Sequence, residues 1–189
     1  PSGSFILSRL SPVIDEEPFL LPEGECFRSS IGPISEAKNS GFMKRVSKSD
    51  WLQAALELLV DEGVEALRVE RLAKKINISK SGFYWHFKDS DDLRKELIAY
   101  WGHEYTDVVI NQLKQFPLTP LQQLTYIAKM VIENDLAKYD LGMQTLARSD
   151  ASLSKLVAKV YRARLGITRR LFEELGFSGD ELEVRTELY

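Results

Sequence analysis

The sequence predicts an all-α protein, and three kinds of observation support this prediction. From about residue 50 onward, apolar residues recur at the spacing of an α-helix in one segment after another. Residues that stop helices, chiefly glycine, asparagine and proline, lie between these segments. Serine or aspartate stands before several segments, where its side chain can accept a hydrogen bond from the first turn.

The first predicted helix runs from Asp50 to Gly63. Gly63 is expected to end it, because glycine tolerates the positive φ of a helix stop. One face of this helix is apolar, since the following residues recur at i, i+3, i+4 and i+7: Leu52, Ala55, Leu56 and Leu59.

Two shorter helices are expected next. One at about Val69–Ile76 is followed by a tight turn at Asn77, because asparagine is the non-glycine residue that best tolerates the left-handed conformation. Ser79 is expected to cap the other, which continues to Trp85. Two short helices joined by a tight turn, behind a stabilising first helix, form a helix-turn-helix unit.

The last of these helices has a polar outward face. Ile78 and Phe83 are its expected apolar anchors. The residues left outside are Lys80, Ser81, Gly82 and Tyr84. Small residues permit close approach to a major groove, and Lys and Ser can reach phosphates or base edges. A plain three-helix domain with a solvated polar helix is the alternative, and periodicity does not decide between the two.

A denser pattern runs through the same stretch. It consists of Ala54-Ala55 with Gly63, Leu72-Ala73, Ser79-Lys80 with Tyr84 and Phe87, and Phe87 with Leu93. These residues, in this order, resemble the DNA-binding domain of TetR-family transcriptional regulators over about a quarter of the chain.

The resemblance implies an architecture and a function. Residues 43–93 are expected to be the helix-turn-helix DNA-binding domain, which a fourth helix links to a helical effector-binding and dimerisation domain at 94–189. The expected protein is a homodimer that binds a double-stranded DNA operator, most often as a repressor released by a small-molecule effector. No cofactor is expected.

The resemblance also implies where the DNA contacts lie. Phosphate contacts are expected from Lys48, Arg68, Lys80, Tyr84 and His86. Ser81 and Gly82 are expected to approach the bases. The remaining expected DNA contacts are Lys44, Arg45, Ser79 and Ser90.

Neighbouring aromatic and histidine residues have simpler expected roles. Trp85 and Phe87 are expected to pack against the first and fourth helices. His86 is expected to be exposed. His103 lies seventeen residues further along with no cluster of ligands around it, so no metal site is expected.

Three residues depart from the family pattern. Asn77 replaces the usual glycine of the turn, which its tolerance of positive φ allows. Ser90 stands where a lysine often contacts a phosphate. Arg68 replaces a small hydroxyl residue and offers a charge-assisted contact in its place.

The charge distribution agrees modestly with a DNA partner. The whole chain has a formal charge of −3. Between Lys44 and Lys88 there are nine Lys and Arg against six Asp and Glu, so this stretch is +3 and the remainder is −6. A basic DNA-binding domain joined to an acidic body would orient the molecule toward DNA.

Cysteine content and hydropathy predict a cytoplasmic protein with no membrane partner. Cys26 is the only cysteine, so no internal disulfide forms, as is usual in a reducing compartment. No apolar run approaches the roughly 20 residues that span a bilayer. Phe5-Ile6-Leu7 is too short for the core of a signal peptide.

Residues 1–42 are expected to be an irregular extension, either vector-derived or translated from upstream. They hold five of the seven prolines and show no helical period, and Met43-Lys44-Arg45 reads like a natural start. Their apolar residues leave docking on the body or on a partner open. An arm that enters the minor groove is less favoured.

Several helices are expected after the DNA-binding domain. The fourth should begin with Asp89 or Ser90 as its cap and end near Gln115, before Pro117 and Pro120. The others are expected at about Leu121–Lys138, at about Leu141–Arg148, from a Ser152 cap to a stop at Gly176, and from Asp180 onward. The helix at about Leu121–Lys138 should bury Leu124, Ile127, Ala128, Val131 and Ile132. Because the family's body ends with two helices, the chain is expected to be incomplete at its C-terminus.

The body is expected to hold an effector pocket lined by aromatic residues and methionines. The candidates are Tyr100, Trp101, Tyr105, Tyr126, Met130, Tyr139, Met143 and Phe172. For each of them, simple core packing is the alternative.

Two other function classes compete with a regulator. An enzyme is disfavoured, because the chain has no glycine-rich phosphate loop and no paired carboxylates beside a base. A helical protein-interaction module that keeps the fold without operator-specific DNA binding stays open, because of Ser90 and the net acidity. Salt-sensitive binding to duplex DNA distinguishes it from a regulator.

Overall fold

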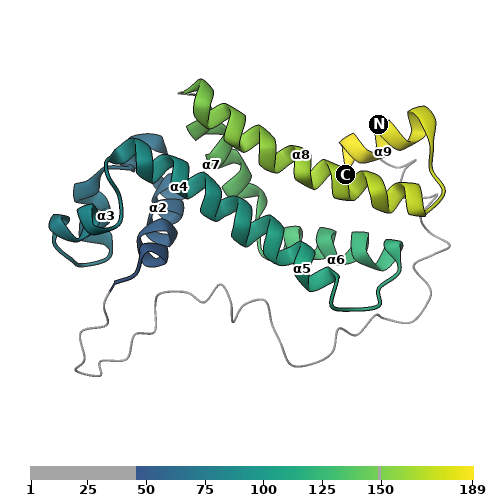
Figure 1. The fold of residues 1–189 in the computed structure, drawn as a ribbon, viewed down its shortest axis with the longest axis horizontal. Helices are drawn as coiled ribbons and strands as arrows, with labels where there is room; N and C mark the ends of the chain where they lie inside the picture. The colour runs from purple at the N-terminus through teal and green to yellow at the C-terminus, as the bar shows by residue number, and fades with distance from the viewer. Residues whose placement is uncertain (1–45, 149) are drawn as a thin grey trace. The chain divides into compact units, whose positions relative to one another are not determined.

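The computed structural model describes residues 46–148 and 150–189, and every regular element in these ranges is helical (Figure 1). This confirms the all-α prediction. The α-helices are α2 (Lys48–Glu62), α3 (Val69–Lys75), α4 (Ser90–Gly102), α5 (Val108–Leu113), α6 (Pro120–Glu133), α7 (Ala137–Ala147), α8 (Ala151–Glu174) and α9 (Gly179–Leu188). Two 3₁₀ turns, η4 (Val64–Ala66) and η5 (Lys80–Trp85), and one π-helical turn, η6 (His103–Asp107), complete the order. The predicted extension at residues 1–42 lies outside the described residues.

Helix α2 begins two residues before the predicted start because Ser47 and Asp50 form a capping box. The Asp50 amide donates to Ser47 Oγ at 3.2 Å, and the Ser47 amide donates to Asp50 Oδ2 at 2.7 Å. Gly63 ends the helix with a φ of 83°, as predicted. The buried face includes all four residues of the predicted apolar repeat.

The turn after α3 agrees with the sequence, but the helix that follows it differs. Asn77 has a φ of 55°, the expected left-handed conformation. Residues 80–85 form a 3₁₀ turn rather than an α-helix, with the Gly82 amide donating to the Ser79 carbonyl at 3.1 Å. Ser79 makes no side-chain cap, since its hydroxyl lies 2.8 Å from the hydroxyl of Ser81 instead.

The fourth predicted helix begins as expected and contains a π turn in its middle. Asp89 caps α4 by accepting from the Asp92 amide at 2.8 Å. The predicted single helix to about Gln115 is confirmed to Leu113, since α4, the π turn η6 and α5 follow one another without a break. A π turn is a single-turn widening of a helix and is often found at functional positions.

The two helices predicted at 121–138 and 141–148 are α6 and α7, with the boundary between them several residues earlier than expected. Thr119 and Gln122 form a capping box at the start of α6. The helix stops at Glu133 because Asp135 takes a φ of 49°, and α7 then begins at Ala137. The prediction that Val131 and Ile132 are buried is wrong, since they are 40% and 77% exposed.

In the last two helices, the cap of α8 differs from the prediction and its end agrees with it. Asp150 rather than Ser152 caps α8, because its carboxylate accepts from the amides of Ser152 and Leu153. Gly176 closes the helix with a φ of 92°, as predicted. Helix α9 follows at Gly179.

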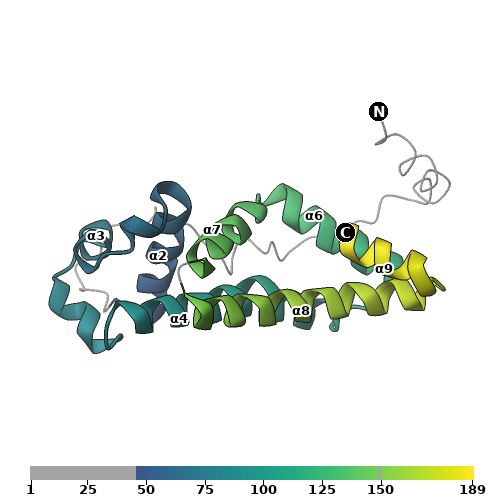
Figure 2. The same cartoon turned by 90° about the horizontal axis from the view of Figure 1, so that it is seen from above.

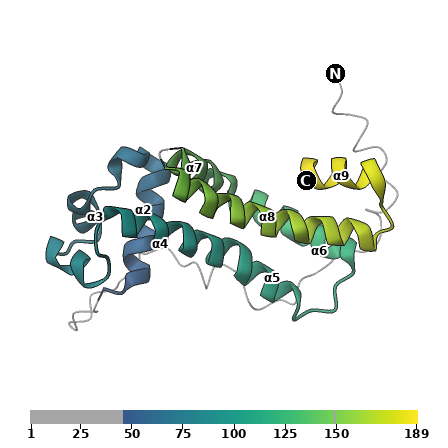
Figure 3. The same ribbon diagram turned by 45° about the horizontal axis from the view of Figure 1, so that its top comes forward.

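Helices α4 and α8 run side by side and connect the helix-turn-helix end of the molecule with the rest of the bundle (Figures 1 and 3). The approach is closest at Gly102, where a Cβ would lie 2.8 Å from Val160 Cγ2. Helix α7 contacts both α2 and α8, while α6 and α9 pack on the other end of α8 (Figure 2). A shift of α4 therefore involves both the first helix and the bundle.

Candidate DNA-binding surface and small-molecule cavity

Phe83 holds the turn η5 on the body of the helix-turn-helix unit. Its side chain is fully buried, with its ring edge-on to Trp51 at 5.6 Å and tilted against Phe87 at 5.0 Å. This three-ring cluster fixes the rotation of η5 about its own axis. It leaves Lys80, Ser81 and Tyr84 exposed to solvent.

Two neighbouring residues lie on faces other than the predicted ones. Gly82 points inward, because a Cβ there would lie 3.1 Å from Ile78 Cδ1 and 3.6 Å from Trp51 Cζ2. Trp85 was expected to pack inside but is 83% exposed. In a 3₁₀ turn the third residue along returns to the same face, so Trp85, two residues after the buried Phe83, turns away from the core.

The predicted phosphate-binding cations each lie beside a carboxylate. Lys80 Nζ lies 2.8 Å from Glu70 Oε1, and Lys48 Nζ lies 3.0 Å from Glu96 Oε2 and over the Phe87 ring. Arg68 lies 3.5 Å from Glu65. All three cations remain at least 40% exposed at their side chains, so they are accessible to a competing anion.

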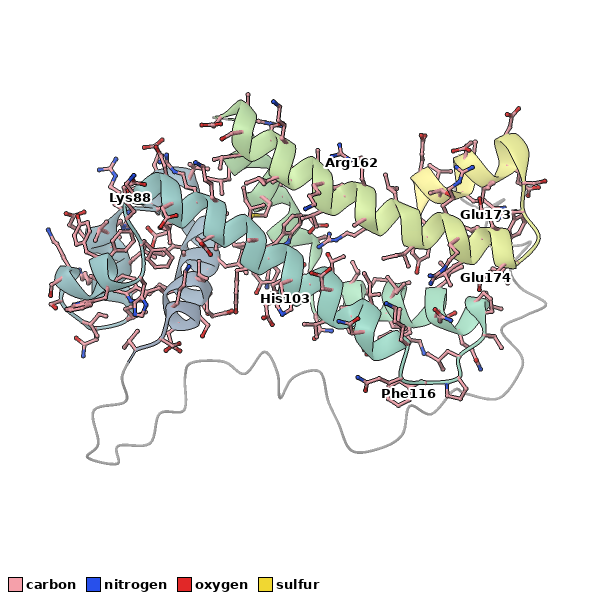
Figure 4. The ribbon with its side chains drawn as sticks, in the orientation of Figure 1. Lys88, His103, Phe116, Arg162, Glu173 and Glu174 are labelled. Atoms are coloured by element: carbon pink, nitrogen blue, oxygen red, sulfur yellow. The ribbon has the colours of Figure 1, made fainter. Side chains whose placement is uncertain are left out.

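The remaining predicted DNA contacts are distributed around the same end. His86 and Ser90 are half-buried, and Ser79 is exposed. Lys44 and Arg45 lie outside the described residues. Lys88, which the sequence reasoning missed, is exposed in the loop between η5 and α4 (Figure 4). Its position just after the predicted third helix could have indicated a DNA contact, but Lys88 was only counted in the local net charge.

A cavity of about 490 Å³ lies in the bundle between η6, α5, α6, α8 and α9. This volume is in the range of small-molecule sites. Most of the wall is aliphatic and includes Val109, Ile110, Ile127, Leu136 and Leu165.

Arg164 forms the polar corner of this cavity. Its Nη1 donates to both carboxylate oxygens of Asp140 at 2.9 Å, and its Nε donates to Thr106 Oγ1 at 2.7 Å. The guanidinium also lies over the ring of Trp101 at 4.6 Å and near that of Tyr161 at 5.8 Å. A single side chain of α8 thereby contacts α4, the π turn and α7.

The wall differs from the predicted pocket. Of the eight predicted residues, Tyr105 lines the cavity. Trp101 and Met143 are fully buried in the core, and Met130 is 6% exposed. Tyr100 donates to Gln53 Oε1 at 3.0 Å, and burial raises its pKa to about 12.

The other three predicted pocket residues also lie elsewhere. Tyr139 stacks on Tyr105 at 5.0 Å, Phe172 packs against Phe177 at 5.9 Å, and Tyr126 is half-buried on α6. Sequence reasoning missed the polar members of the wall, chiefly Thr106, Asp140, Tyr161 and Arg164. They lie on three separate segments, η6, α7 and α8, so no local pattern groups all four.

Two features are absent from the described ranges. No helix in them is long and apolar enough to cross a membrane. They also contain no group of three or more His, Cys, Asp or Glu placed to hold a metal ion.

The helix-turn-helix region of this chain is similar in sequence to known proteins. Residues 52–97 match the family described as "Bacterial regulatory proteins, tetR family". The HTH-type transcriptional regulator AcrR of Shigella flexneri is 29% identical over 87 residues, covering 46% of this chain and 40% of that protein. The class D tetracycline repressor protein of Escherichia coli is 35% identical over 68 residues, or 34% of this chain and 31% of that protein. The chain thus matches two fifths or less of the length of these relatives.

Solved structures extend the similarity of fold to most of the chain. The regulatory protein TetR from Rhodobacter sphaeroides superposes with a TM-score of 0.61 at 20% identity, over 74% of this chain and 80% of that one. A TetR-family regulator from Mesorhizobium loti MAFF303099 gives 0.56 at 21% identity, over 75% and 76%. Residues 52–97 thus form a domain of the tetR family of bacterial regulatory proteins.

Proposed function

We propose that this protein is a homodimeric repressor that binds a specific DNA operator and is released from it by a small molecule. The observation that carries the proposal is the orientation of η5. With Phe83 buried against Trp51, the turn leaves Lys80, Ser81 and Tyr84 exposed to solvent. An exposed second element of a helix-turn-helix unit enters a major groove in proteins of this architecture.

The proposed contacts divide by chemistry. Lys48, Arg68 and Lys80 exchange their carboxylate partners for phosphates, and the Tyr84 hydroxyl donates to a phosphate oxygen. Ser81 is the side chain that approaches base edges. Exposed Trp85 adds an apolar surface beside it.

A second proposed component is release by an effector in the cavity. The π turn η6 is part of the cavity wall and continues directly from α4, which packs on α2. A ligand that binds better to one position of this helix shifts the population of DNA-binding geometries in a dimer. Exposed apolar residues on the last two helices, including Leu165 and Val184, support a self-association surface.

The test is binding of the full chain to the intergenic DNA upstream of its own gene, titrated with salt. Tight binding that survives competitor DNA and weakens with rising salt supports the proposal. Lys80→Ala should weaken binding and reduce the salt dependence by about one phosphate contact. Lys159→Ala, an equal charge change on an exposed position of α8, serves as the control.

A helical interaction module is the second candidate function. The observation that favours it is the pairing of each described candidate cation, Lys48, Arg68 and Lys80, with a carboxylate. Weak binding to every DNA sequence alike, unaffected by Lys80→Ala, would support this candidate over the repressor.

A further inference from the structure

We infer that the cavity between α5, α6, α8 and α9 takes an uncharged, mostly apolar small molecule that carries few polar groups. The inference rests on the proposed effector function of this cavity, and it adds the chemical class of the effector. It follows from which polar groups of the wall are already used within the protein.

The one cation of the wall, Arg164, is already neutralised. Asp140 accepts from it with both carboxylate oxygens at 2.9 Å, and Thr106 accepts from its Nε at 2.7 Å. The side chains of the pair are only 25% and 31% exposed, so separating them leaves two partly desolvated charges. An anionic ligand would have to displace Asp140 or lie beside its carboxylate.

A cationic ligand meets the opposite obstacle. At Asp140 it would compete with the guanidinium of Arg164 and lie next to that positive charge. The other carboxylate of the wall, Glu187, is exposed, so water screens its attraction for a cation. Neither sign of charge therefore finds a buried partner in this wall.

Four hydroxyl groups of the wall are also occupied. Thr168 donates to the Arg164 carbonyl at 3.2 Å, and Thr186 donates to the Leu182 carbonyl at 2.8 Å. The Tyr161 hydroxyl accepts from Gln144 Nε2 at 3.1 Å, and the Tyr189 hydroxyl donates to the Leu124 carbonyl. A ligand rich in polar groups would leave them without partners.

Two polar contacts remain open to a ligand. The hydroxyl of Tyr105, which lines the wall, is buried and has no hydrogen-bond partner among the described residues. Each oxygen of Asp140 accepts one hydrogen bond from Arg164 and keeps a further lone pair, so a ligand hydroxyl can donate there without breaking the ion pair. The aliphatic wall accommodates the rest of the ligand.

The test uses three probes with eight carbon atoms each: 1-octanol, octanoate and octylammonium. Calorimetric titration into the full chain at pH 7 should show octanol binding more tightly than either ion by roughly tenfold or more. Equal or tighter binding of either ion, or no binding of any probe at millimolar concentration, overturns the inference.

Three variants locate the effect. Ala128→Trp fills the cavity and should abolish octanol binding, whereas Ala151→Trp, at an exposed position outside the wall, should not. Asp140→Asn keeps an oxygen acceptor but leaves Arg164 unpaired, so octanoate should become the preferred probe. Octanol binding that persists in Ala128→Trp, or an unchanged preference in a folded Asp140→Asn protein, contradicts the inference.

Failure of the proposed function is distinguishable from failure of this inference. The binding measurements use no DNA, so they report on the cavity alone. If octanol binds as expected but DNA affinity does not change at saturation, the chemical class stands and the proposed release mechanism fails.

Discussion

Lys80 of η5 and Glu70 of α3 form an ion pair, with Nζ and Oε1 2.8 Å apart, across the turn that joins the two elements. The hydrogen bond from Lys80 is the main cause that lowers the pKa of the Glu70 carboxyl below its ordinary value. Both side chains are about three-fifths exposed. The pair therefore orients Lys80 in the free protein and competes with a phosphate for the same ammonium group.

The first prediction concerns this competition. Glu70→Gln should raise affinity for operator DNA by roughly two- to fivefold, because Lys80 is freed and a negative charge near the DNA is removed. Fluorescence anisotropy with labelled DNA measures the change. Glu174→Gln makes the same charge change at the far end of α8 and should leave affinity unaltered (Figure 4). Equal effects of both variants would show that only net charge matters.

The second prediction concerns Tyr84. Its side chain is 65% exposed, so Tyr84→Phe should leave the unfolding free energy unchanged. DNA binding should weaken by about 1 kcal/mol through loss of one hydrogen bond. Urea unfolding and DNA titration on the same protein separate the two effects. A fall in stability with unaltered DNA binding would instead make Tyr84 a packing residue.

Tryptophan fluorescence tests the outward position of Trp85. Trp51 and Trp101 are fully buried, whereas Trp85 is 83% exposed. Trp85→Phe should therefore remove most of the iodide-quenchable emission and shift the remaining spectrum to shorter wavelength, with little change in stability. Quenching that persists in the variant would mean that another tryptophan is accessible to solvent.

A fourth prediction addresses the crossing of α4 and α8. A Cβ at Gly102 would lie 2.8 Å from Val160 Cγ2, so Gly102→Ala should destabilise the protein by about 1–3 kcal/mol. Val160→Ala in the same chain should recover part of this loss, as a double-mutant cycle measures. Gly166→Ala has open space around it and should be neutral or stabilising. Additive effects at 102 and 160 would contradict the contact.

The fifth prediction concerns alkaline pH. Burial raises the pKa of Tyr100 to about 12 from the ordinary value of 10, so folding favours its neutral form. This contribution to stability is fully present below pH 10 and is lost as the pH rises through 12. Absorbance at 295 nm should show one tyrosine fewer ionising near pH 12 in Tyr100→Phe. A lost transition near pH 10 would mean that Tyr100 is solvated.

The sequence predicted three positions at which the backbone takes a positive φ. Gly63, Asn77 and Gly176 all take the positive φ expected of them, because the steric limits on φ act within a single residue. The burial of Phe83 also followed from local spacing. The prediction failed at Trp85, because it assumed that a large aromatic side chain packs in the core, whereas a residue two positions after the buried Phe83 faces away from the core in either helical geometry.

The sequence by itself thus determined an all-helical chain with a helix-turn-helix unit and its outward residues Lys80, Ser81 and Tyr84. Only the tertiary structure decided the cavity and its polar corner. Arg164 contacts Thr106 and Asp140, which lie 58 and 24 residues away along the chain. Helical periodicity tells which face of a helix is apolar, but it does not tell which other helix that face meets. Pairings between distant helices depend on packing of the whole bundle, and the ion pairs at those contacts depend on it too.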